Sequence, residues 1–294
     1  MPSSRSPLLP FPPFPPFLPF LPPPALGYTP SVPKLSVTII TKNEAADLGA
    51  ALESVSWADE VIVVDSESTD ATVAIARRFT GRVTTRPWPG YVAQKNHAAS
   101  QATHDWILSL DADERVTPAL AQEIRATIAQ TPAHAAFRIP RVTWHLGRWI
   151  RSTDWYPDHQ VRLYDRRSAQ WTGSYVHESV TAQGSVGQLK GELRHFAYRD
   201  IADHLDTIDR YTTYAARQMR EAGRHAGFLR LAGHPPLAFL RNYIARAGFR
   251  DGVPGLVVSS LNAYYVFLKF AKLWELEHVA HAHRQDTKST KELV

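Results

Sequence analysis

The sequence predicts an α/β fold in which a mostly parallel sheet is flanked by helices and followed by a C-terminal helical extension. Short β-rich stretches alternate with stretches of helical spacing between Leu35 and Asp111, which is typical of βαβ units. The expected strands at 60–65 and 106–111 are mainly apolar and of the buried type, as in a parallel sheet with helices on both faces. From Asp200 onward helical spacing returns without further strands, which predicts the extension.

The elements of the first half follow in order from these patterns. They are a strand at 35–40, a helix at 44–55, a strand at 60–65, a helix at 69–79, a strand at 82–85, a helix at 91–102 and a strand at 106–111. Ligands of such sheets bind beyond the carboxyl ends of the strands. Asp65 and Asp111 both stand at such an end, so they are candidate binding residues.

The second half loses the alternation of strands and helices. The expected elements are a helix at 118–130, strands at 135–146 and 159–165, a helix at 201–223 and an apolar stretch at 255–275. These patterns predict an α/β domain at 34–198, a basic and apolar helical extension at 199–280 and a polar tail at 281–294.

Residues 1–33 differ in composition from the rest of the chain, because they hold thirteen of its 22 prolines. Proline at this density prevents the continuous apolar helix of a signal peptide or membrane anchor. We therefore expect a disordered or polyproline-like tail rich in Pro and Phe. The alternatives are a ligand for a proline-recognising module and a start site placed too far upstream.

Charge and cysteine content narrow the class of protein. The chain has 33 Lys and Arg against 28 Asp and Glu, a balance too weak to indicate nucleic-acid binding but compatible with an anionic substrate or membrane surface. No cysteine is present, so disulfides, thiolate zinc sites and cysteine nucleophiles are excluded.

Three carboxylates follow the apolar strand at 106–111, namely Asp111, Asp113 and Glu114. Packed carboxylates resist desolvation and repel one another, so they face solvent or hold a cation. A pair such as Asp111 and Asp113 suits Mg²⁺ or Mn²⁺, which take oxygen ligands, water and substrate phosphates. The alternative is a solvated acidic turn before a helix.

Four segments resemble family-2 glycosyltransferases, nucleotide-sugar enzymes with the GT-A fold. They are, in order, "IITKNEAADLGAALESV", "EVIVVDSESTDAT", "AQKNHAA" and "DADE". The resemblance implies that Thr41 and Glu44 hold the uracil of a UDP-sugar donor and that Asp65 contacts the base. For Asp65 the alternative is a turn in which Ser68 or Thr69 caps the next helix.

The same resemblance implies that Asp113 and Asp111 bind the metal, with Asp111 also holding the ribose. Lys95 precedes this strand and offers positive charge to the nucleotide, unless it is a surface lysine. The stretch 152–180, "STDWYPDHQVRLYDRRSAQWTGSYVHESV", is similar to a narrower branch that extends the inner core of bacterial lipopolysaccharide. That branch implies glucose transfer from UDP-glucose to a core heptose, with coverage from about Leu35 to Glu275.

Inverting transfer requires a base for the acceptor hydroxyl, and Glu178 is our candidate, with Asp158 and Asp154 as rivals. His177 is a possible third metal ligand or diphosphate contact, or else a structural histidine. Arg162 would pair with phosphate or form a structural salt bridge.

Trp155 and Trp171 are candidate platforms for stacking a sugar ring. Aromatic residues near strands are more often part of the core, so that alternative stays open.

The extension suggests a membrane partner. Seven arginines (217, 220, 224, 230, 241, 246 and 250) lie beside an apolar stretch, with Glu221 as the one acid among them. Basic residues next to apolar surface attract anionic lipid. The apolar part at 256–268, "LVVSSLNAYYVFL", is expected to be too short and too polar to span a bilayer. We therefore expect a cytoplasmic protein, peripheral on the inner face of the bacterial cytoplasmic membrane, where a lipid-linked saccharide acceptor would be met. The alternative is a buried terminal helix.

Two other classes compete with a transferase. An aspartate-nucleophile phosphatase also uses Asp-x-Asp with Mg²⁺, but that class normally has Thr or Val two residues after the second Asp, where this chain has Arg115. A non-catalytic binding module is the second alternative. Product formation from a labelled sugar nucleotide separates the transferase from both.

Overall fold

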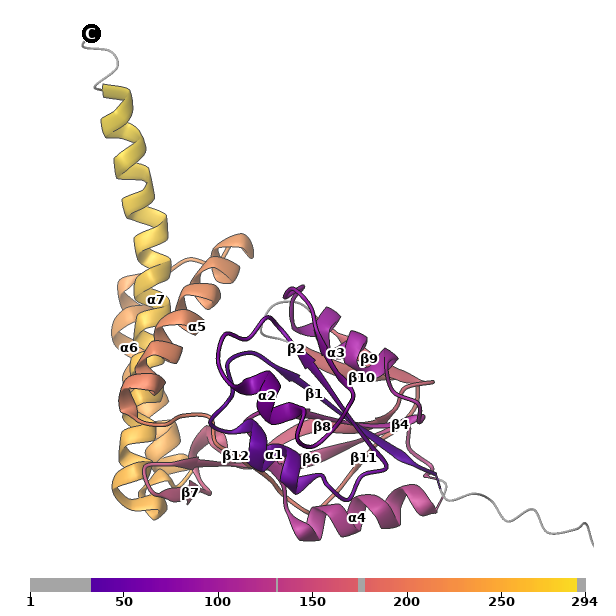
Figure 1. Ribbon diagram of the computed structural model, residues 1–294. Coiled ribbons are helices and arrows are strands. Elements are labelled where there is room, and N and C mark those ends of the chain that lie inside the picture. Colours follow the sequence, from indigo (N-terminus) through magenta and orange to yellow (C-terminus); the bar gives the residue numbers. More distant parts are fainter. Residues whose placement is uncertain (1–32, 131, 174–177, 290–294) are drawn as a thin grey trace, which may run out of the picture. The chain divides into compact units, whose positions relative to one another are not determined.

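The structure, a computed structural model, describes residues 33–130, 132–173 and 178–289, with side chains described to residue 279. The predicted tail at 1–33 lies outside these residues apart from its last position. The described chain forms a ten-stranded mixed sheet with helices on both faces, followed by three C-terminal helices (Figure 1). This arrangement confirms the predicted α/β fold with a helical extension.

The strands divide into a parallel half and a mixed half of the sheet. They are β1 (Leu35–Thr41), β2 (Glu60–Asp65), β3 (Val83–Thr85), β4 (Trp106–Asp111), β5 (Glu114–Val116), β6 (Ala136–His145), β7 (Arg148–Ile150), β8 (Asp158–Asp165), β9 (Ala169–Thr172), β10 (Ser179–Ala182), β11 (Val186–Gln188) and β12 (Leu193–His195). The order is β3-β2-β1-β4-β8-β6-β12-β5, with β7 and β11 also paired to β6. The first four strands in this order are parallel, whereas β8 is antiparallel to β4 and β6. Strands β9 and β10 form a separate antiparallel pair.

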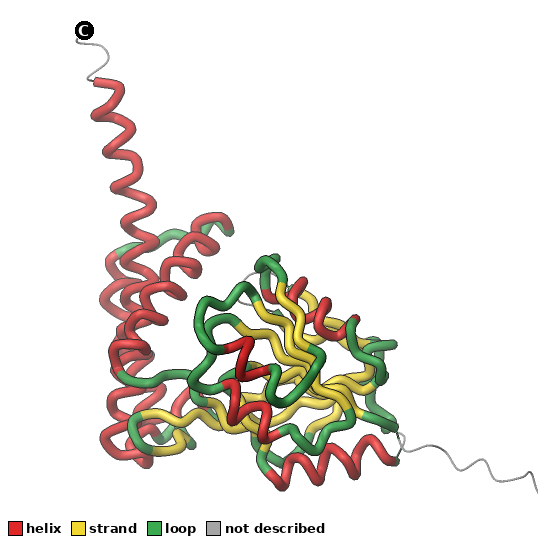
Figure 2. Tube along the Cα trace, viewed as in Figure 1, coloured by secondary structure: helices red, strands yellow, loops and turns green. Residues whose placement is uncertain are grey.

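The helices are α1 (Leu48–Ser54), α2 (Thr72–Ala76), α3 (Tyr91–Ser100), α4 (Pro118–Ala129), α5 (Ile201–Glu221), α6 (Phe228–Leu240) and α7 (Gly252–Ser289). Figure 2 shows these helices in red around the yellow strands. Three short helical turns accompany them: 3₁₀ turns at Thr153–Trp155 and Gly248–Asp251, and a π-helix at Arg241–Ala245.

Helix α1 begins four residues later than the pattern at 44–55 predicts. The backbone N–H of Glu44 donates to Thr72 Oγ1 at 2.8 Å, and that of Ala45 donates to Asp70 Oδ2 at 3.2 Å. These bonds hold the residues after β1 against the loop before α2, so the helix starts only at Leu48.

Two clusters of buried side chains cover the two faces of the sheet. Alternate residues of a strand point to opposite faces, and β2 shows the division clearly. Val63 packs in the cluster that includes Leu52 of α1 and Leu120 of α4. Its neighbours Ile62 and Val64 pack in the other cluster, with residues of α3 and of the β9–β10 pair. Burial on both faces explains why the parallel strands are mainly apolar, with their polar residues concentrated at or near the ends of β2 and β4.

The parallel half of the sheet brings three polar residues to one edge. In the register of the strands Thr41 lies opposite Asp65, and Ile40 lies opposite Asp111. The carboxyl ends of β1, β2 and β4 therefore meet, as the sequence predicts for a binding edge.

The helical extension packs internally and against the α/β region. Helix α5 buries His204, Ile208, Thr212 and Ala216, one residue in every four. Asp251, just before α7, accepts from Ser152 Oγ at 2.5 Å and from the backbone N–H of Arg151 at 2.9 Å. These bonds fix the start of α7 to the segment between β7 and β8.

Helix α7 is longer than the predicted apolar stretch at 255–275. By length and composition alone, residues Gly248–Val279 could cross a membrane, and 22% of the apolar window is buried. The expectation that this stretch is too short to span was therefore wrong. Helix α6 is not among the predicted elements, because Pro235 and Pro236 inside it remove backbone donors and interrupt the helical signal.

Candidate functional site

The acidic turn "DADE" spreads its carboxylates between two strands. Asp111 ends β4 and Glu114 begins β5, so Ala112 and Asp113 form the turn between them. Strand β5 pairs with β12 in an antiparallel register that sets Glu114 opposite His195. The three carboxylates therefore have different neighbours.

Glu114 anchors this turn from inside the protein. It is fully buried, and its Oε1 accepts from Arg141 Nη1 at 2.9 Å and from Arg162 Nη2 at 2.7 Å. Its Oε2 accepts the backbone N–H of Asp111 at 3.1 Å. An unpaired buried carboxylate costs on the order of several kcal/mol, and these donors offset that cost. Glu114 is thus a structural carboxylate that ties the turn to β6 and β8.

Asp111 is held by two cations. Its Oδ1 lies 3.0 Å from Lys95 Nζ, and its Oδ2 accepts from Arg162 Nη2. Burial raises the pKa of the Asp111 carboxyl, but Arg162 and then Lys95 outweigh burial and hold this pKa far below its usual range. Asp111 is therefore ionised at every physiological pH.

Three successive residues of α3 connect the loops around the site. The Gln94 Nε2 donates to Ser66 Oγ at 3.0 Å, just after β2. Lys95 pairs with Asp111 and is 4% exposed, which excludes the surface-lysine alternative. The Asn96 side chain exchanges hydrogen bonds with the backbone of Trp171, at 2.9 and 3.0 Å. The "QKN" stretch thus joins β2, β4 and β9.

Glu178 brings a further carboxylate to Lys95. Its Oε1 lies 3.9 Å from Lys95 Nζ, so one ammonium group faces both Asp111 and Glu178. The Oε2 of Glu178 is buried and has no hydrogen-bond partner among the described residues. Buried acceptors normally receive a hydrogen bond. This oxygen can therefore accept one from a hydroxyl of a bound molecule.

Asp113 and His195 lie next to each other at the acidic turn. The Asp113 Oδ2 lies 3.2 Å from His195 Nε2, and the Asp113 side chain is 30% exposed. Burial raises the pKa of Asp113, but His195 and Arg141 together outweigh burial and lower this pKa below its usual value, so the carboxyl is ionised. Among the residues that the structure describes, no three His, Asp or Glu side chains surround one point. Such a pair leaves coordination positions to water and phosphate oxygens, as Mg²⁺ and Mn²⁺ prefer.

Glu44 faces the same place from the loop after β1. Burial and the negative charges of Asp113, Asp47 and Asp70 raise its pKa to about 7, while Arg199 opposes the increase. A carboxylate kept among other carboxylates is unfavourable for folding but favourable for holding positive charge.

We expect Glu44→Gln to stabilise the protein at pH 8 and to leave its stability nearly unchanged at pH 4.5. Between about pH 4.5 and 7 the unfolded state ionises Glu44 while the folded state keeps it protonated, so stability falls as the pH rises. The glutamine variant does not lose stability in this way. Thermal unfolding at both pH values measures the difference in melting temperature between the variant and the unmodified protein. Glu53→Gln, on the exposed side of α1, is the matched control. An equal shift in melting temperature at both pH values would contradict the elevated pKa.

Thr41 and Asp65, predicted to contact the base, lie side by side at the sheet edge and are both buried. The Thr41 Oγ1 has no hydrogen-bond partner among the described residues. The Asp65 carboxylate accepts from Ser68 Oγ at 2.5 Å and from the Ser68 backbone N–H at 2.9 Å. For Asp65 this geometry favours the turn that the sequence left as an alternative, but Ala71 is the N-cap of α2, so the expected capping by Ser68 or Thr69 is wrong. The Asp65 carboxylate still has further lone pairs.

The rivals of Glu178 are engaged elsewhere. Asp158 accepts from Arg141 Nη2 at 2.6 Å and Nε at 2.9 Å. Asp154 accepts from Arg241 Nη2 at 2.7 Å and from Asn242 Nδ2 at 3.1 Å, which ties it to the C-terminal helices. Both carboxylates thus serve structural ion pairs in this conformation.

Arg162 lies in the site, where its guanidinium pairs with two carboxylates of the protein and is therefore not free for a ligand. It is 3% exposed and its Nη2 bridges Asp111 and Glu114. These two carboxylates outweigh burial and raise its pKa. The geometry favours the structural salt bridge over a direct phosphate contact.

Neither candidate tryptophan presents a free stacking face. Trp171 is buried, and Lys95 Nζ lies 4.2 Å from the centre of its ring. Trp155 packs in an aromatic cluster with His145, Tyr198 and His204, at ring distances of 5.4 to 5.6 Å. The core alternative describes both side chains better.

His177 lies outside the described residues, so its predicted role stays a prediction. His195 and Arg141 are site residues that the sequence reasoning missed. Arg141 stands in an ordinary strand pattern, and His195 is far from "DADE" along the chain. Only the pairing of β12 with β5 and β6 reveals them.

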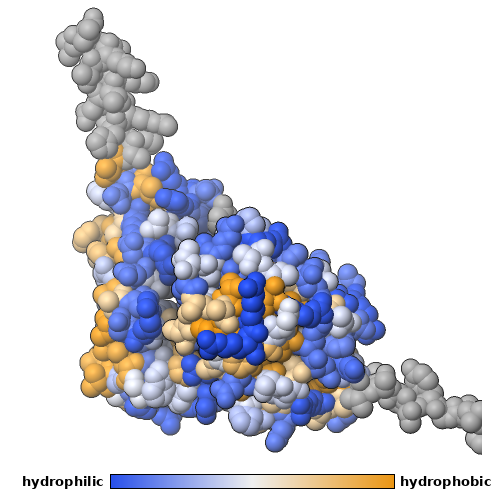
Figure 3. Space-filling view, viewed as in Figure 1, coloured by the Kyte–Doolittle hydropathy of each residue, from blue (hydrophilic) through white to orange (hydrophobic). Residues whose placement is uncertain are grey.

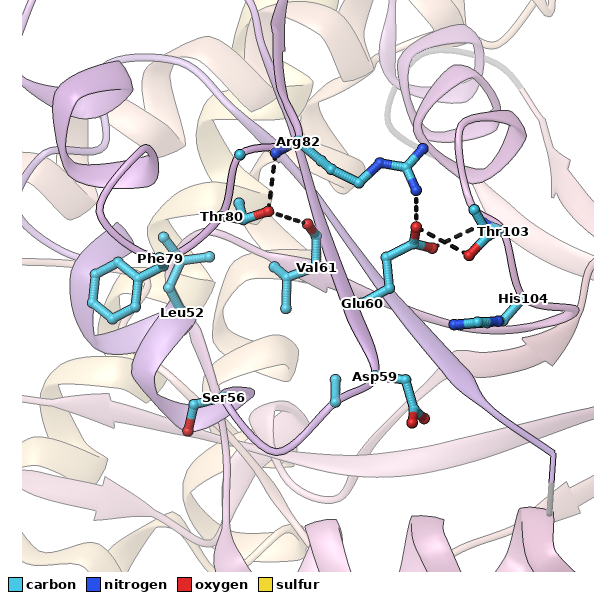
Figure 4. A pocket seen from close by; sticks show the side chains of 12 residues that line it. Leu52, Ser56, Asp59, Glu60, Val61, Phe79, Thr80, Arg82, Thr103 and His104 are labelled. Carbon is cyan, nitrogen blue, oxygen red and sulfur yellow. Dashed lines mark hydrogen bonds and ion pairs between the residues drawn. The ribbon is translucent and has the colours of Figure 1, made fainter.

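A pocket of about 530 Å³ lies at the other end of the parallel strands (Figure 4). Several of its polar side chains are engaged with one another or with the backbone. Glu60 accepts from Thr103 N at 2.9 Å and contacts Arg82, while Thr80 Oγ1 donates to the Val61 carbonyl at 2.7 Å. Because Glu60 and Arg82 are paired with each other, this pocket offers fewer free charges than the cluster at the carboxyl ends.

Comparison with known proteins agrees with the geometry. The sequence model described as Glycosyl transferase family 2 matches residues 36–184. The chain is 32% identical over 253 residues to the lipopolysaccharide core biosynthesis glycosyltransferase LpsC of Rhizobium meliloti (strain 1021), covering 83% of this chain and 94% of that protein. It is 34% identical over 256 residues to an uncharacterized glycosyltransferase of Rickettsia typhi, covering 83% and 87% of the two chains.

One solved structure matches over a similar length. It is the mannosyltransferase PcManGT from Pyrobaculum calidifontis in complex with GDP-Man and Mn²⁺. The identity is 15% and the TM-score 0.49, over 82% of this chain and 87% of that one.

Proposed function

Because this chain belongs to glycosyl transferase family 2, we propose that it is a metal-dependent inverting enzyme that transfers a hexose to a lipid-linked saccharide. The donor in this proposal is UDP-glucose, and the acceptor is a heptose of the lipopolysaccharide core. The relative LpsC, whose name assigns it to lipopolysaccharide core biosynthesis, supports the acceptor class. The observation that carries the proposal is the meeting of Glu178, Lys95 and Asp111 at the binding edge of the sheet.

Glu178 is the general base in this proposal. The acceptor hydroxyl gives its proton to the Glu178 carboxylate while its oxygen bonds to the anomeric carbon of the donor. The bond from that carbon to the diphosphate oxygen breaks, and the electron pair leaves with the nucleoside diphosphate. The buried, unpartnered Oε2 supports this role, since it can accept the hydrogen bond from the hydroxyl.

The donor would lie over the carboxyl ends of β1, β2 and β4. Thr41, Glu44 and Asp65 would contact the base, and Asp111 would contact the ribose. The unpartnered Oγ1 of Thr41 supports its place in this set. The base contact of Asp65 would have to use lone pairs that Ser68 leaves free.

Asp113 and His195 would hold Mg²⁺ or Mn²⁺. When bound there, the cation neutralises the diphosphate and stabilises it as a leaving group. Lys95 adds a fixed positive charge near Asp111, and Arg162 keeps Asp111 ionised and oriented. His195 thus joins the metal set predicted from the sequence.

A lipid-linked acceptor has to be met at a membrane surface. We therefore infer that the protein is peripheral on the inner face of the bacterial cytoplasmic membrane and meets anionic lipid there. The arginines and apolar residues of the helical extension support this location.

A panel experiment tests the proposal. Purified protein with Mg²⁺ would be incubated with UDP-glucose, UDP-galactose and GDP-mannose, each with a soluble heptose-containing core fragment. Mass spectrometry should show a single added hexose with UDP-glucose, and none in a parallel reaction with EDTA. Transfer only to a different glycan would move the enzyme to another cell-surface polysaccharide or glycolipid. Phosphate release from a phosphomonoester without sugar transfer would contradict the proposal.

A further inference from the structure

Helix α7 exposes one narrow apolar stripe along most of its described length. The stripe consists of Val253, Leu256, Tyr264, Phe267 and Trp274, each between 41% and 72% exposed. Their spacings of three, eight, three and seven residues keep them on one side of a helix. At about 1.5 Å per residue the stripe is about 32 Å long.

Helix α6 carries a second exposed apolar side. Leu229, Leu237 and Leu240 are 83%, 64% and 51% exposed, and Ile244 continues the row in the π-helix that follows. No residue of α6 is fully buried. Figure 3 shows hydrophobic residues gathered in orange over α6.

The opposite sides of these helices are already used. Phe270 and Leu273 of α7 pack with Ala216 of α5, and Leu231 of α6 packs against the same cluster. His234 of α6 lies over Phe270, with ring centres 5.1 Å apart. The exposed stripes of α6 and α7, which we call the outer apolar face, are therefore the sides that nothing in the described chain covers.

Arginines accompany the outer apolar face. Arg230 on α6 and Arg250 beside α7 are exposed. Arg217, Arg220 and Arg224 are exposed as well, but they lie at or just after the end of α5, the helix that packs against the other side of α7. None of these five has an acidic partner among the described residues. Arg241 and Arg246 differ, because both face Asp154, at 2.7 and 3.6 Å. Part of the positive charge predicted from the sequence is thus neutralised, and Arg230 and Arg250 remain as exposed cations on or next to the helices of the outer apolar face.

We propose that the outer apolar face docks onto an anionic lipid bilayer, with α7 lying in the plane of the headgroups rather than across the membrane. Exposed apolar patches of this extent mark interaction sites. An apolar face with arginines at its edge is complementary to acyl chains beneath anionic headgroups.

The packing of α5 argues against a spanning α7. Lys272 of α7 donates to the Asp209 carbonyl and carboxylate and to Thr213 Oγ1, at 2.6 to 2.7 Å. If α7 crossed the bilayer, this ion pair and the charged side of α5 would enter the hydrocarbon. Charged side chains there are rare and costly. In-plane docking keeps them in water.

A second copy of the chain fits the face less well than lipid does. Two-fold dimers bring the same patch of both subunits together. The flanking arginines of one copy would then face those of the other. Anionic lipid removes this repulsion, which is why we commit to the membrane.

Vesicle flotation of the full chain tests the docking surface. The protein should float with vesicles of phosphatidylglycerol and phosphatidylethanolamine and much less with phosphatidylcholine. Leu229→Ser, Leu240→Ser, Val253→Ser and Leu256→Ser together should weaken binding at least tenfold. Phe79→Ser, a single change of the same kind at an exposed apolar residue of the α/β region, should bind vesicles as the unmodified protein does.

Other outcomes would overturn the inference. Unchanged vesicle binding by the fourfold serine variant would do so, as would retention in cell membranes after carbonate extraction, which indicates a spanning helix. A dimer by light scattering that the same substitutions abolish, without lipid binding by the unmodified protein, would assign the face to a second copy. Circular dichroism melting confirms that the variant is folded.

The inference deepens the proposed function by naming its membrane contact, but vesicle binding requires no turnover. Transfer to a soluble acceptor therefore succeeds or fails separately.

Discussion

Glu178→Gln is expected to lower the rate of sugar transfer by about 10²–10⁴-fold while donor and metal affinities stay near those of the unmodified enzyme. Glutamine keeps the size of the side chain but cannot take the proton of the acceptor hydroxyl. Glu178 is suited to this test because its Oε2 has no partner in the described chain and its Oε1 is 3.9 Å from Lys95. Single-turnover kinetics and calorimetric titration of the nucleotide measure the two quantities.

Asp158→Asn and Asp154→Asn serve as controls for the base assignment. Both carboxylates are held in ion pairs with arginines, so these variants should lose stability more than turnover. If Glu178→Gln retained a rate within a few-fold of the unmodified enzyme and Asp158→Asn did not, the base would be Asp158. If Glu178→Gln lost nucleotide binding, Glu178 would belong to the diphosphate or metal sphere instead.

Asp113→Ala should remove the metal dependence of nucleotide binding. With Mg²⁺ present, affinity should fall by more than about 100-fold, because loss of an outer-sphere partner alone costs about 10–100-fold. Titration of UDP with and without Mg²⁺ measures the effect. Asp105→Ala is the matched control, since that aspartate also lies next to β4 but is 46% exposed and pairs with Arg167.

His195→Ala tests the ligand that the structure adds. Its imidazole lies 3.2 Å from the Asp113 carboxylate, so its loss should weaken Mn²⁺-supported binding in the same direction. Metal-supported UDP affinity that is unchanged in Asp113→Ala would move the cation away from this turn. An effect in Asp113→Ala with none in His195→Ala would leave the aspartate as a ligand and exclude the histidine.

The parallel half of the fold is predictable because local patterns and packing agree there. Strands such as 60–65 are apolar on both faces, and helices with apolar residues at helical spacing connect them. Helix boundaries are less predictable. The late start of α1 depends on hydrogen bonds to Asp70 and Thr72, which lie more than 20 residues away in the sequence. Local helix propensity depends on neighbouring residues only, so it cannot predict hydrogen bonds to such distant partners.

The residues of the candidate site likewise fall into those that the sequence can predict and those that it cannot. Asp111, Asp113 and Lys95 can be found from short motifs, because strand ends and one helix place them. Arg141 and His195 cannot, because their positions depend on how β6 and β12 pair with the rest of the sheet. The surroundings of Arg162, which decide between a phosphate contact and a salt bridge, also become visible only when β8 is placed beside β4.

The short connection between β12 and α5 limits how this enzyme can be divided. His195 and the first residue of α5, Ile201, are separated by five residues, and within them Tyr198 stacks on His204 at 4.1 Å. Burial, together with His145, lowers the pKa of His204 to about 4, so this contact is made by an uncharged ring. Exchanging the helical extension with that of a relative would therefore disturb the strand that carries His195. The helical extension therefore cannot be exchanged as a free-standing cassette; a functional chimera would have to join upstream of β12 and keep Tyr198 with its histidine partner.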